Sequence, residues 1–383
     1  MSARRVYLDY TATTPLDERV AAAMRPYLSE IFGNANALYR EGREAFTALT
    51  EAHHAIARSI GARMPQEVIA TSGGTESDVS ALIGIAEALA SMPKGKGRTR
   101  IITSSMEHHA ILEPAKRLGR LGFAVERIDP RPNGFVHPDD LAALIGTQGD
   151  VALVSIMSVN NETGCVQPIR ELSAVAHAQG ALFHTDAVQA LGKIPFDVRA
   201  LDVDAASFSA HKLYGPKGVG ALYLRKGTPF APYLPGGGQE GGLRSGTSNV
   251  AGLVGFARAC ELATADLPAD FARAAELRER LVKGLAHLDP APTLPVDAGV
   301  CTFEDTLHSP YILSCLFDGY ESETLILRLD ERGYCVSGGS ACSSRSLEPS
   351  HVMRALSIPT RRALGLIRIS IGRDTDDSAI DGF

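Results

Sequence analysis

Several segments of this sequence carry residue types that could do chemistry, and the first contains Lys212. It lies in Ser207–Gly218, where hydroxyl and histidine side chains precede a loop rich in glycine and proline. An isolated lysine is usually a solvated surface charge. A lysine that forms a Schiff base needs a desolvated or cation-adjacent setting, because its amine must be nucleophilic at neutral pH. The segment around Lys212 is a candidate for such a setting.

A glycine turn with adjacent hydroxyl groups, Thr71–Ser77, could bind phosphate. It lies between an apolar run and an amphipathic helical pattern that begins at Thr75. Gly73 and Gly74 allow a tight turn, and free N–H groups at a helix start beside a hydroxyl form a phosphate cradle. When the motif is taken alone, an ordinary capped turn between strand and helix explains it equally well.

A carboxylate follows the apolar run Ala181–Phe183, in the segment His184–Gln189. In open α/β sheets, ligands bind at the carboxyl ends of strands. Asp186 could there pair with a protonated ring nitrogen of a cofactor. Taken alone, an aspartate that caps a helix is the simpler explanation.

One cysteine differs from the others in its setting. Cys342 lies in Gly338–Ser344, which is rich in glycine and serine, so we expect an exposed, mobile thiol that could act as a nucleophile. No C-x-x-C pair occurs, which argues against a zinc ribbon, and the spacing is not that of a disulfide scaffold. The cysteines expected to be buried packing groups are Cys165, Cys260, Cys301, Cys315 and Cys335.

The elements that must position these residues alternate between strands and helices. Helical spacing occurs in Thr75–Ala90 and Ile169–Gln179. The alternation predicts an α/β fold with a mostly parallel, seven-stranded sheet covered by helices on both faces. Gly220–Leu224 follows its predecessor by a loop and is therefore a candidate antiparallel strand. The expected strands are Glu67–Ala70, Arg100–Ser104, Ala124–Ile128, Val151–Ile156, Ala181–His184, Ala205–Ser209 and Gly220–Leu224.

After about residue 250 the pattern changes and predicts a smaller α+β domain. A helical stretch runs from Val250 to Leu288, and a proline-rich piece follows it. Strands are expected near Tyr311–Phe317 and Ile367–Ile371, with a helix near Glu323–Glu331.

Composition excludes several classes of protein. Of 383 residues, 45% are hydrophobic, which is too apolar for a disordered chain. The formal net charge of −6 leaves no basic footprint, so direct nucleic-acid binding is not expected. No apolar run is long enough to span a membrane, and the first residues lack the apolar core of a secretory signal. We therefore expect a soluble, cytoplasmic enzyme.

Taken together, the ordered motifs resemble the class V branch of fold-type I pyridoxal-phosphate (PLP) enzymes, and within it cysteine desulfurases of the NifS/IscS type. The resemblance covers nearly the whole chain. It implies a PLP-binding large domain at 16–255 and a small domain at 1–15 plus 256–383 that carries the catalytic cysteine loop. The motifs are Tyr7–Pro15, Thr71–Ser77, Glu107–His109, Val159–Gly164, Asp186–Gln189, Ser209–Gly218, Arg244–Thr247, Ser340–Ser344 and Leu347–Ser350.

The resemblance implies a role for each site residue and no metal. Lys212 would form the Schiff base with PLP, and His108 would stack on the ring and move protons. Asp186 would pair with the ring nitrogen, which makes the ring an electron sink. Asn161 and Gln189 would contact the ring hydroxyl, and Asn161 and Arg368 would bind the substrate carboxylate. The residues implied around the phosphate are Gly74, Thr75, Ser209 and His211, together with Thr247 from the second subunit of a homodimer.

The implied reaction converts L-cysteine to L-alanine and leaves a persulfide on Cys342, from which sulfur passes to an acceptor protein. Iron–sulfur cluster assembly, tRNA or DNA thio-modification and a thio-cofactor pathway are all open as destinations. A selenocysteine lyase or C–S lyase of the same fold, or a weakly active subunit that docks partners, is the alternative. Two departures from the family pattern motivate the last of these: Tyr39 replaces a frequent histidine, and the chain ends at Phe383, soon after Arg368. A further departure, Gly241 and Gly242 in place of a segment that often carries a basic residue, leaves the identity of the sulfur acceptor open.

Overall fold

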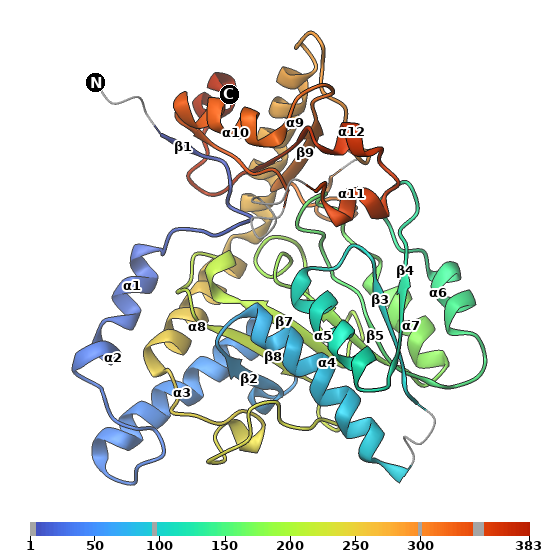
Figure 1. Ribbon diagram of the computed structural model, residues 1–383. Helices are drawn as coiled ribbons and strands as arrows, with labels where there is room; N and C mark the ends of the chain where they lie inside the picture. The colour runs from blue at the N-terminus through green and yellow to red at the C-terminus, as the bar shows by residue number, and fades with distance from the viewer. Residues whose placement is uncertain (1–4, 94–97, 298–300, 340–347) are drawn as a thin grey trace.

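A twisted sheet with helices on both faces forms the larger part of the computed structural model, which describes residues 5–93, 98–297, 301–339 and 348–383 (Figure 1). Within these ranges, seven strands form this sheet in the order β2-β8-β7-β6-β5-β3-β4. Only β8 runs antiparallel to its neighbours, and the other strands are parallel. The predicted fold class and the exceptional strand are both confirmed. The strands are β2 (Val68–Thr71), β3 (Arg100–Ser104), β4 (Ala124–Ile128), β5 (Val151–Ser155), β6 (Leu182–Asp186), β7 (Ala205–Ser209) and β8 (Gly220–Leu224).

The central strands are apolar because both of their faces are covered. Every residue of β5, β7 and β8 is buried, as parallel sheets between two helical layers require. The edge strand β4 is different, since Glu126 and Arg127 lie on it and it is partly exposed. Charged side chains at a sheet edge discourage pairing with another chain.

Helices pack on the two faces in separate groups. One face is covered by α4 and α5, and the opposite face by α3, α6, α7 and α8. The helix α8 packs along α3. The bounds are α3 (Arg40–Ser59), α4 (Gly74–Ser91), α5 (His109–Arg120), α6 (Pro138–Ile145), α7 (Ile169–Ala178) and α8 (Val250–Ala265), preceded by the short helices α1 (Glu18–Met24) and α2 (Pro26–Ser29).

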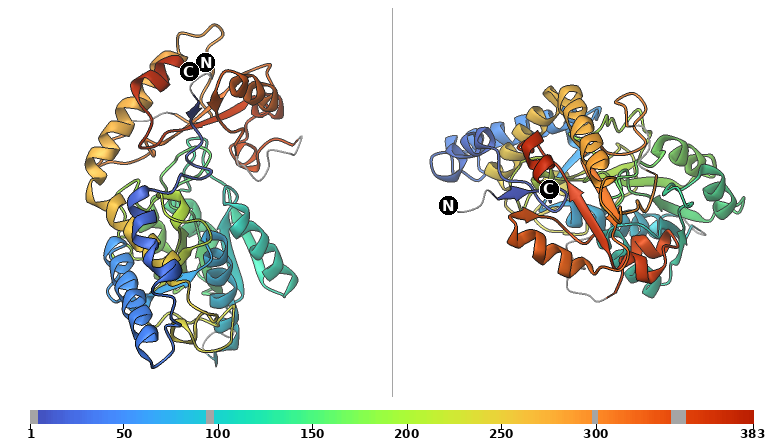
Figure 2. Two further views of the ribbon diagram at one scale, coloured as in Figure 1. Left: turned by 90° about the vertical axis from the view of Figure 1, so that its left-hand side faces the viewer. Right: turned by 90° about the horizontal axis from the view of Figure 1, so that it is seen from above.

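A second group of elements lies beyond the carboxyl edge of the main sheet (Figures 1 and 2). Its antiparallel pair, β9 with β11, packs against α9, and β1 pairs with β10 in parallel. The predicted helix Val250–Leu288 is wrong as one element: it breaks at Asp266, because Pro268 in the first turn of α9 cannot donate a backbone hydrogen bond. The elements are β1 (Val6–Tyr7), α9 (Leu267–Leu285), β9 (Ile312–Leu316), α10 (Ser322–Glu331), β10 (Tyr334–Cys335), α11 (His351–Ala355), α12 (Thr360–Ala363), β11 (Leu366–Ser370) and α13 (Asp377–Gly382).

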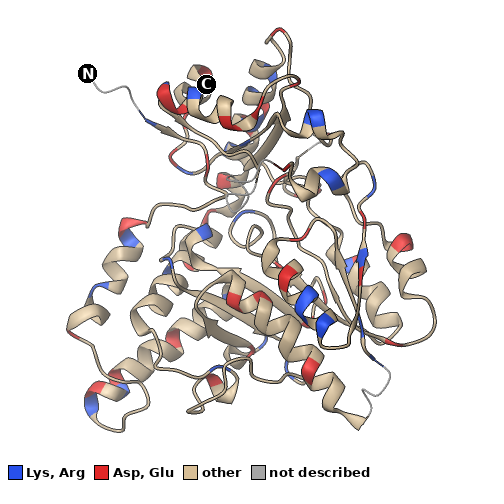
Figure 3. Ribbon diagram, viewed as in Figure 1, with Lys and Arg blue, Asp and Glu red and all other residues tan. Residues whose placement is uncertain are grey.

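The domain boundaries at 15/16 and 255/256 stay a prediction, and the second of them falls inside α8. Acidic and basic residues are interspersed over both groups of elements (Figure 3). None of the helices in the described ranges is long and apolar enough to cross a membrane.

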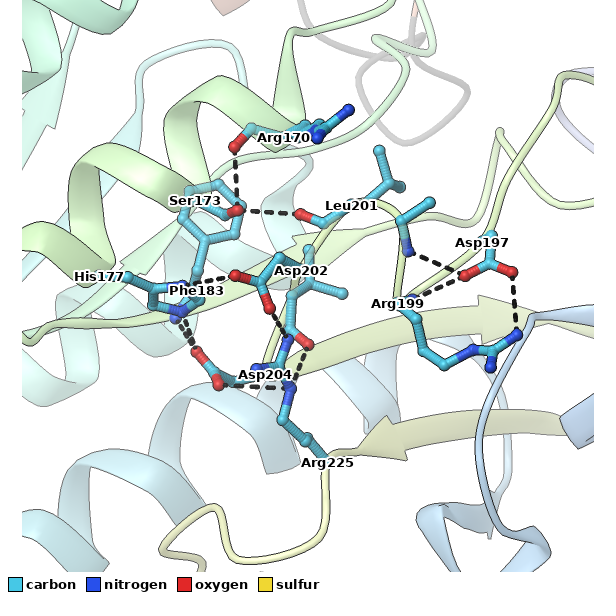
Figure 4. Close-up of polar contacts among 12 residues, drawn as sticks. Arg170, Ser173, His177, Phe183, Asp197, Arg199, Leu201, Asp202, Asp204 and Arg225 are labelled. Carbon is cyan, nitrogen blue, oxygen red and sulfur yellow. Dashed lines mark hydrogen bonds and ion pairs between the residues drawn. The ribbon is translucent and has the colours of Figure 1, made fainter.

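Charged side chains gather at the amino edge of β6 and β7, opposite the carboxyl ends of those strands (Figure 4). Asp204 accepts hydrogen bonds from the backbone N–H of Phe183 and from the His177 ring, both at 2.8 Å. Arg225 donates to Asp202 at 2.6 Å. The hydrogen bond with Asp204 raises the pKa of His177 above its ordinary value, and the charge of Asp202 adds to this.

This contact predicts a pH-dependent contribution to stability. A group whose pKa is raised on folding stabilises the folded state below its unfolded pKa, and that contribution disappears as the pH rises through the folded pKa. We therefore expect His177→Gln to lower the free energy of unfolding by about 1 kcal/mol at pH 6, and by much less at pH 9. Urea unfolding at the two pH values measures this difference. His287→Gln, at an exposed ring that follows α9, is the control, and an equal loss for His177→Gln at both pH values would contradict the prediction.

Candidate functional site

A cavity of about 260 Å³ lies at the carboxyl edge of the main sheet. It contains every predicted site residue that the structure describes, with the exception of Thr247. Sequence reasoning did not assign Thr11, Ala12, Asp78, Met157 or Val188 to it. Its lining is Thr11, Ala12, Gly74, Thr75, Asp78, His108, Met157, Asn161, Asp186, Val188, Gln189, Ser209, His211, Lys212 and Arg368.

The strand order brings these residues together. The strands β2, β3, β5, β6 and β7 run parallel, so the loops after them meet at one edge of the sheet. Thr75 lies in the first turn of α4 after β2, and His108 precedes α5 after β3. Asp186 ends β6, and Lys212 lies in the 3₁₀ turn Ala210–Lys212 directly after β7. Arg368 comes from β11, which belongs to the second group of elements.

The start of α4 fits an anion. Gly73 has φ of 151°, a conformation that favours glycine, and its backbone caps α4 without a side-chain hydrogen bond. A Cβ atom on Gly74 would lie 2.7 Å from Cγ2 of Val188, so a larger residue fits here only if Val188 moves. The hydroxyl groups of Thr75 and Ser209 border the same cavity. A helix N-terminus with adjacent hydroxyl groups suits phosphate.

The N-terminal segment holds the Lys212 turn in place. Nζ of Lys212 donates to the carbonyl oxygens of Thr11 at 2.6 Å and Ala12 at 2.7 Å. The N–H of Thr14 donates to the carbonyl of His211 at 3.1 Å, and the N–H of Tyr214 donates to Oγ1 of Thr14 at 2.8 Å. The amine of Lys212 is therefore oriented by backbone groups that lie about 200 residues away in sequence.

A buried layer of acidic groups lies at the sheet edge. Burial raises the pKa of Asp186 to about 6, although the N–H of Val188 and the charge of Lys212 act in the opposite direction. Burial also raises the pKa of Asp78, and the negative charge of Asp186 raises it further. Oδ1 of Asp78 is buried without a hydrogen-bond partner in the described part of the chain. A cation in the cavity beside Asp186 would relieve this charge, so the site fits a protonated ring nitrogen.

Two histidines of the cavity are neutral. Burial lowers the pKa of His108 to about 4, and the nearby charges of Lys212, His109 and His351 contribute. Its Nδ1 accepts a hydrogen bond from the N–H of Ala110 at 3.1 Å, which orients the ring as the cap of α5. Burial also lowers the pKa of His211 to about 4. Both rings are therefore hydrogen-bonding and stacking groups, and not cations, at neutral pH.

The arginine of the cavity is already paired in this structure. Arg368 is 1% exposed, and its guanidinium donates to Asp9 at 2.7 Å and to the carbonyl oxygen of Asn161 at 3.1 Å. Its Nε is buried without a hydrogen-bond partner among the described residues. A carboxylate that enters the cavity would compete with Asp9 for the planar guanidinium group of Arg368. Sequence reasoning missed Asp9 as a contact, although it belongs to the quoted motif Tyr7–Pro15.

The remaining predicted residues lie outside the cavity or outside the described chain. Thr247 is exposed, in a loop that Arg244 anchors to Glu76 at 2.8 Å. Cys342 lies in 340–347, outside the described residues. Of the other cysteines, Cys165, Cys260 and Cys315 are buried as expected, whereas Cys301 and Cys335 are only partly buried. Burial raises the pKa of Cys165 and Cys301 to about 11 and that of Cys315 to about 12.

Comparisons with known proteins agree on one family. Residues 6–383 match the family Aminotransferase class-V. A cysteine desulfurase IscS of Dictyoglomus turgidum is 46% identical over 96% of this chain and 90% of its own length. A cysteine desulfurase of Cereibacter sphaeroides is 45% identical over 98% and 93%.

Solved structures also resemble the chain. A NifS-like protein is 38% identical, with a TM-score of 0.88 over 98% of this chain and 96% of its own. The structure of SspA in complex with cysteine is 33% identical, with a TM-score of 0.79 over 95% and 98%.

The glycine at position 74 offers a test of the cavity geometry. We expect Gly74→Ala to lower the free energy of unfolding by about 2 kcal/mol, because its methyl group would overlap Val188. Val188→Ala should restore part of this loss in the double variant, as measured by urea unfolding. Gly119→Ala, where a Cβ would lie 3.8 Å from its nearest neighbour, is the control and should not destabilise. If Gly74→Ala lowers the free energy of unfolding by the same amount in the wild-type chain and in the Val188→Ala variant, the geometry is contradicted.

Proposed function

Because the chain belongs to the class V aminotransferase family, and within it to the cysteine desulfurases, we propose that PLP and L-cysteine bind in the cavity and that Lys212 and Cys342 serve the transfer of sulfur. The observation that supports this site best is the meeting of Lys212, Asp186 and the start of α4 around one cavity. These groups match the aldehyde, the ring nitrogen and the phosphate of PLP.

The residues present fit PLP in charge as well as in position. The start of α4, with Thr75, Ser209 and His211, would hold the phosphate. Asp186 would pair with the ring nitrogen, and the flat ring of neutral His108 would cover the face of the cofactor. When bound, PLP supplies an electron sink for the electrons of a substrate Cα–H bond. The ring oxygen would lie within reach of Gln189 and Asn161.

Side chains of the protein would then transfer the protons of the reaction. Nζ of Lys212 takes the proton from the Cα atom of L-cysteine and returns a proton later, which requires that the amine be neutral when it acts. The carbonyl oxygens of Thr11 and Ala12 hold that amine at the cavity wall. His108, neutral because of its burial, could accept a second proton. Arg368 would orient the substrate through its carboxylate.

Cys342 would break the carbon–sulfur bond of the substrate. Its thiolate attacks the substrate sulfur, so that a sulfur–sulfur bond forms while the C–S bond breaks, and the carbon left behind gains a proton to give L-alanine. The products are a persulfide and L-alanine, with no external oxidant. The persulfide sulfur then passes to an acceptor protein. The solved complex of SspA with cysteine supports cysteine as the ligand, and a thiol nucleophile suits the reducing cytoplasm, where we place the enzyme.

Substitutions at Lys212 and Cys342 separate the two roles. Lys212→Ala should abolish the visible Schiff-base absorbance of the PLP-loaded enzyme and lower alanine formation at least about 100-fold. Cys342→Ser should keep the absorbance and lose persulfide formation, as measured by alanine and sulfide assays with L-cysteine and a reductant. Cys335→Ser, at a thiol in the second group of elements, should keep both properties. Normal turnover by Cys342→Ser would remove Cys342 from the mechanism.

A second copy of the chain would complete the site. Large apolar side chains are exposed at and around α2 and the start of α3, and Val250, close to Thr247, packs on Ala45 and Ala48 of α3. Thr247 therefore lies on the side of the molecule that carries this apolar surface, and it does not line the cavity of its own chain. We propose a homodimer in which Thr247 of one subunit reaches the phosphate of the other. The exposed side chains are Leu28, Phe32, Leu38, Tyr39 and Phe46, with exposed fractions of 57–89%.

The dimer is testable through Phe32, whose side chain is 74% exposed. Phe32→Asp should shift the protein toward monomer in analytical ultracentrifugation and lower alanine formation in proportion, because a charge would be buried in the contact. Leu327→Asp, at an equally apolar and 65% exposed position on α10, is the control and should leave both unchanged. A wild-type protein that is monomeric and fully active would exclude this arrangement.

A further inference from the structure

An ion pair between His53 and Glu240 lies outside the cavity, beside the strand β2. Nε2 of His53, on α3, is 2.8 Å from Oε2 of Glu240, which belongs to the loop 235–248 that also carries Thr247. The two side chains are only 14% and 7% exposed. The same carboxylate oxygen accepts the N–H of Ala70 on β2 at 3.0 Å. Because β2 is the edge strand of the main sheet in the described part of the chain, Glu240 joins the loop to both α3 and the sheet edge.

The hydrogen bonds of His53 require a proton on each ring nitrogen. Nδ1 lies 2.8 Å from the carbonyl oxygen of Leu49, and Nε2 faces the carboxylate of Glu240. Carbonyl and carboxylate oxygens only accept hydrogen bonds, and a neutral imidazole donates from only one of its two nitrogens. Loss of one ring proton therefore breaks one of these hydrogen bonds and removes the positive charge that faces Glu240.

The surroundings of His53 favour the charged ring. Burial lowers its pKa, but the hydrogen bond with Glu240, the charge of Glu240 and the carbonyl of Leu49 together outweigh burial, so the pKa lies above its ordinary value. The other charged or titratable groups on the elements that pack against α3 are Glu67, which accepts backbone N–H groups, Arg258 and Glu261, which pair with each other, Arg244, which pairs with Glu76, and the buried Cys260.

The backbone at Glu240 needs such an anchor. Glu240 has φ of 52°, in the left-handed region that a residue with a Cβ atom adopts only at a cost, and Gly241 follows with φ of 64°. Beyond this turn, Arg244 pairs with Glu76 in the first turn of α4 at 2.8 Å. The loop 235–248 is therefore held at two points, and His53 supplies the one that depends on a proton.

We propose that His53 is a positioning residue: its doubly protonated ring holds Glu240, and with it the loop 235–248, against the edge strand β2. The anchor is present at low pH and is lost as the pH rises through the pKa of the folded-state ring. The consequence for a neighbouring subunit, whose phosphate Thr247 would reach, rests on the proposed function. The anchor itself does not.

Hydrogen–deuterium exchange of the full-length chain freed of PLP tests the anchor, because the N–H of Ala70 is one of its donors. The protection of peptides that cover Ala70 and residues 236–247, corrected for the intrinsic exchange rate at each pH, should fall about ten-fold between pH 6 and pH 9, since a charge-assisted hydrogen bond is lost. His54→Gln, at the exposed histidine next in sequence, is the control and should behave as the wild type. Equal protection of the wild-type chain at both pH values would overturn the proposal.

Two substitutions of His53 identify the group that titrates. His53→Arg keeps a positive charge at both pH values, so the peptides should be as protected at pH 9 as at pH 6. His53→Leu has neither charge nor donor, so protection should be low at both. A wild-type fall at pH 9 in His53→Arg, or full protection at pH 6 in His53→Leu, would overturn the proposal. Since no PLP is present, failure of the proposed cofactor site leaves these results readable.

Discussion

Charge held out of water at the carboxyl edge of the sheet is the constraint on which the rest of the structure depends. Lys212, Asp186 and Arg368 meet around a cavity of about 260 Å³, and each needs a partner because isolated buried charges are unstable. Backbone carbonyls, turn N–H groups and a single aspartate supply those partners. The strand order is what allows this, since parallel strands deliver their following loops to one place.

The N-terminal segment connects the two groups of elements through these charges. Asp9 pairs with Arg368 on β11, while Thr11 and Ala12 accept from Lys212 after β7. The segment therefore aligns the residue proposed to bind the substrate carboxylate with the amine proposed to move its proton. Few contacts are involved, but they connect the N-terminal segment to two separate sheets, at positions that lie about 200 and 359 residues away in sequence.

Much of the architecture could be predicted from the sequence, because strands buried on both faces consist of short apolar runs. The segments between these runs carry apolar residues at helical spacing. The seven strands lie within two residues of the predicted bounds at each end. The break between α8 and α9 was missed, since Leu267–Leu285 continues the same helical spacing and only Pro268 marks the new start. Thr75, His108, Asp186 and Lys212 were predictable as neighbours because each follows a parallel strand.

What the sequence by itself determined was the set of side chains that meet at the sheet edge and the family to which their order belongs. Only the tertiary structure decided how those side chains are held. The acceptors for Lys212 are backbone carbonyls, which have no residue type to recognise, and the pairing of Arg368 with Asp9 joins positions 359 residues apart. The protonation states followed from burial as well: His108 is neutral and Asp186 gives up its proton less readily because water is excluded around them, and exclusion of water is a property of packing rather than of sequence.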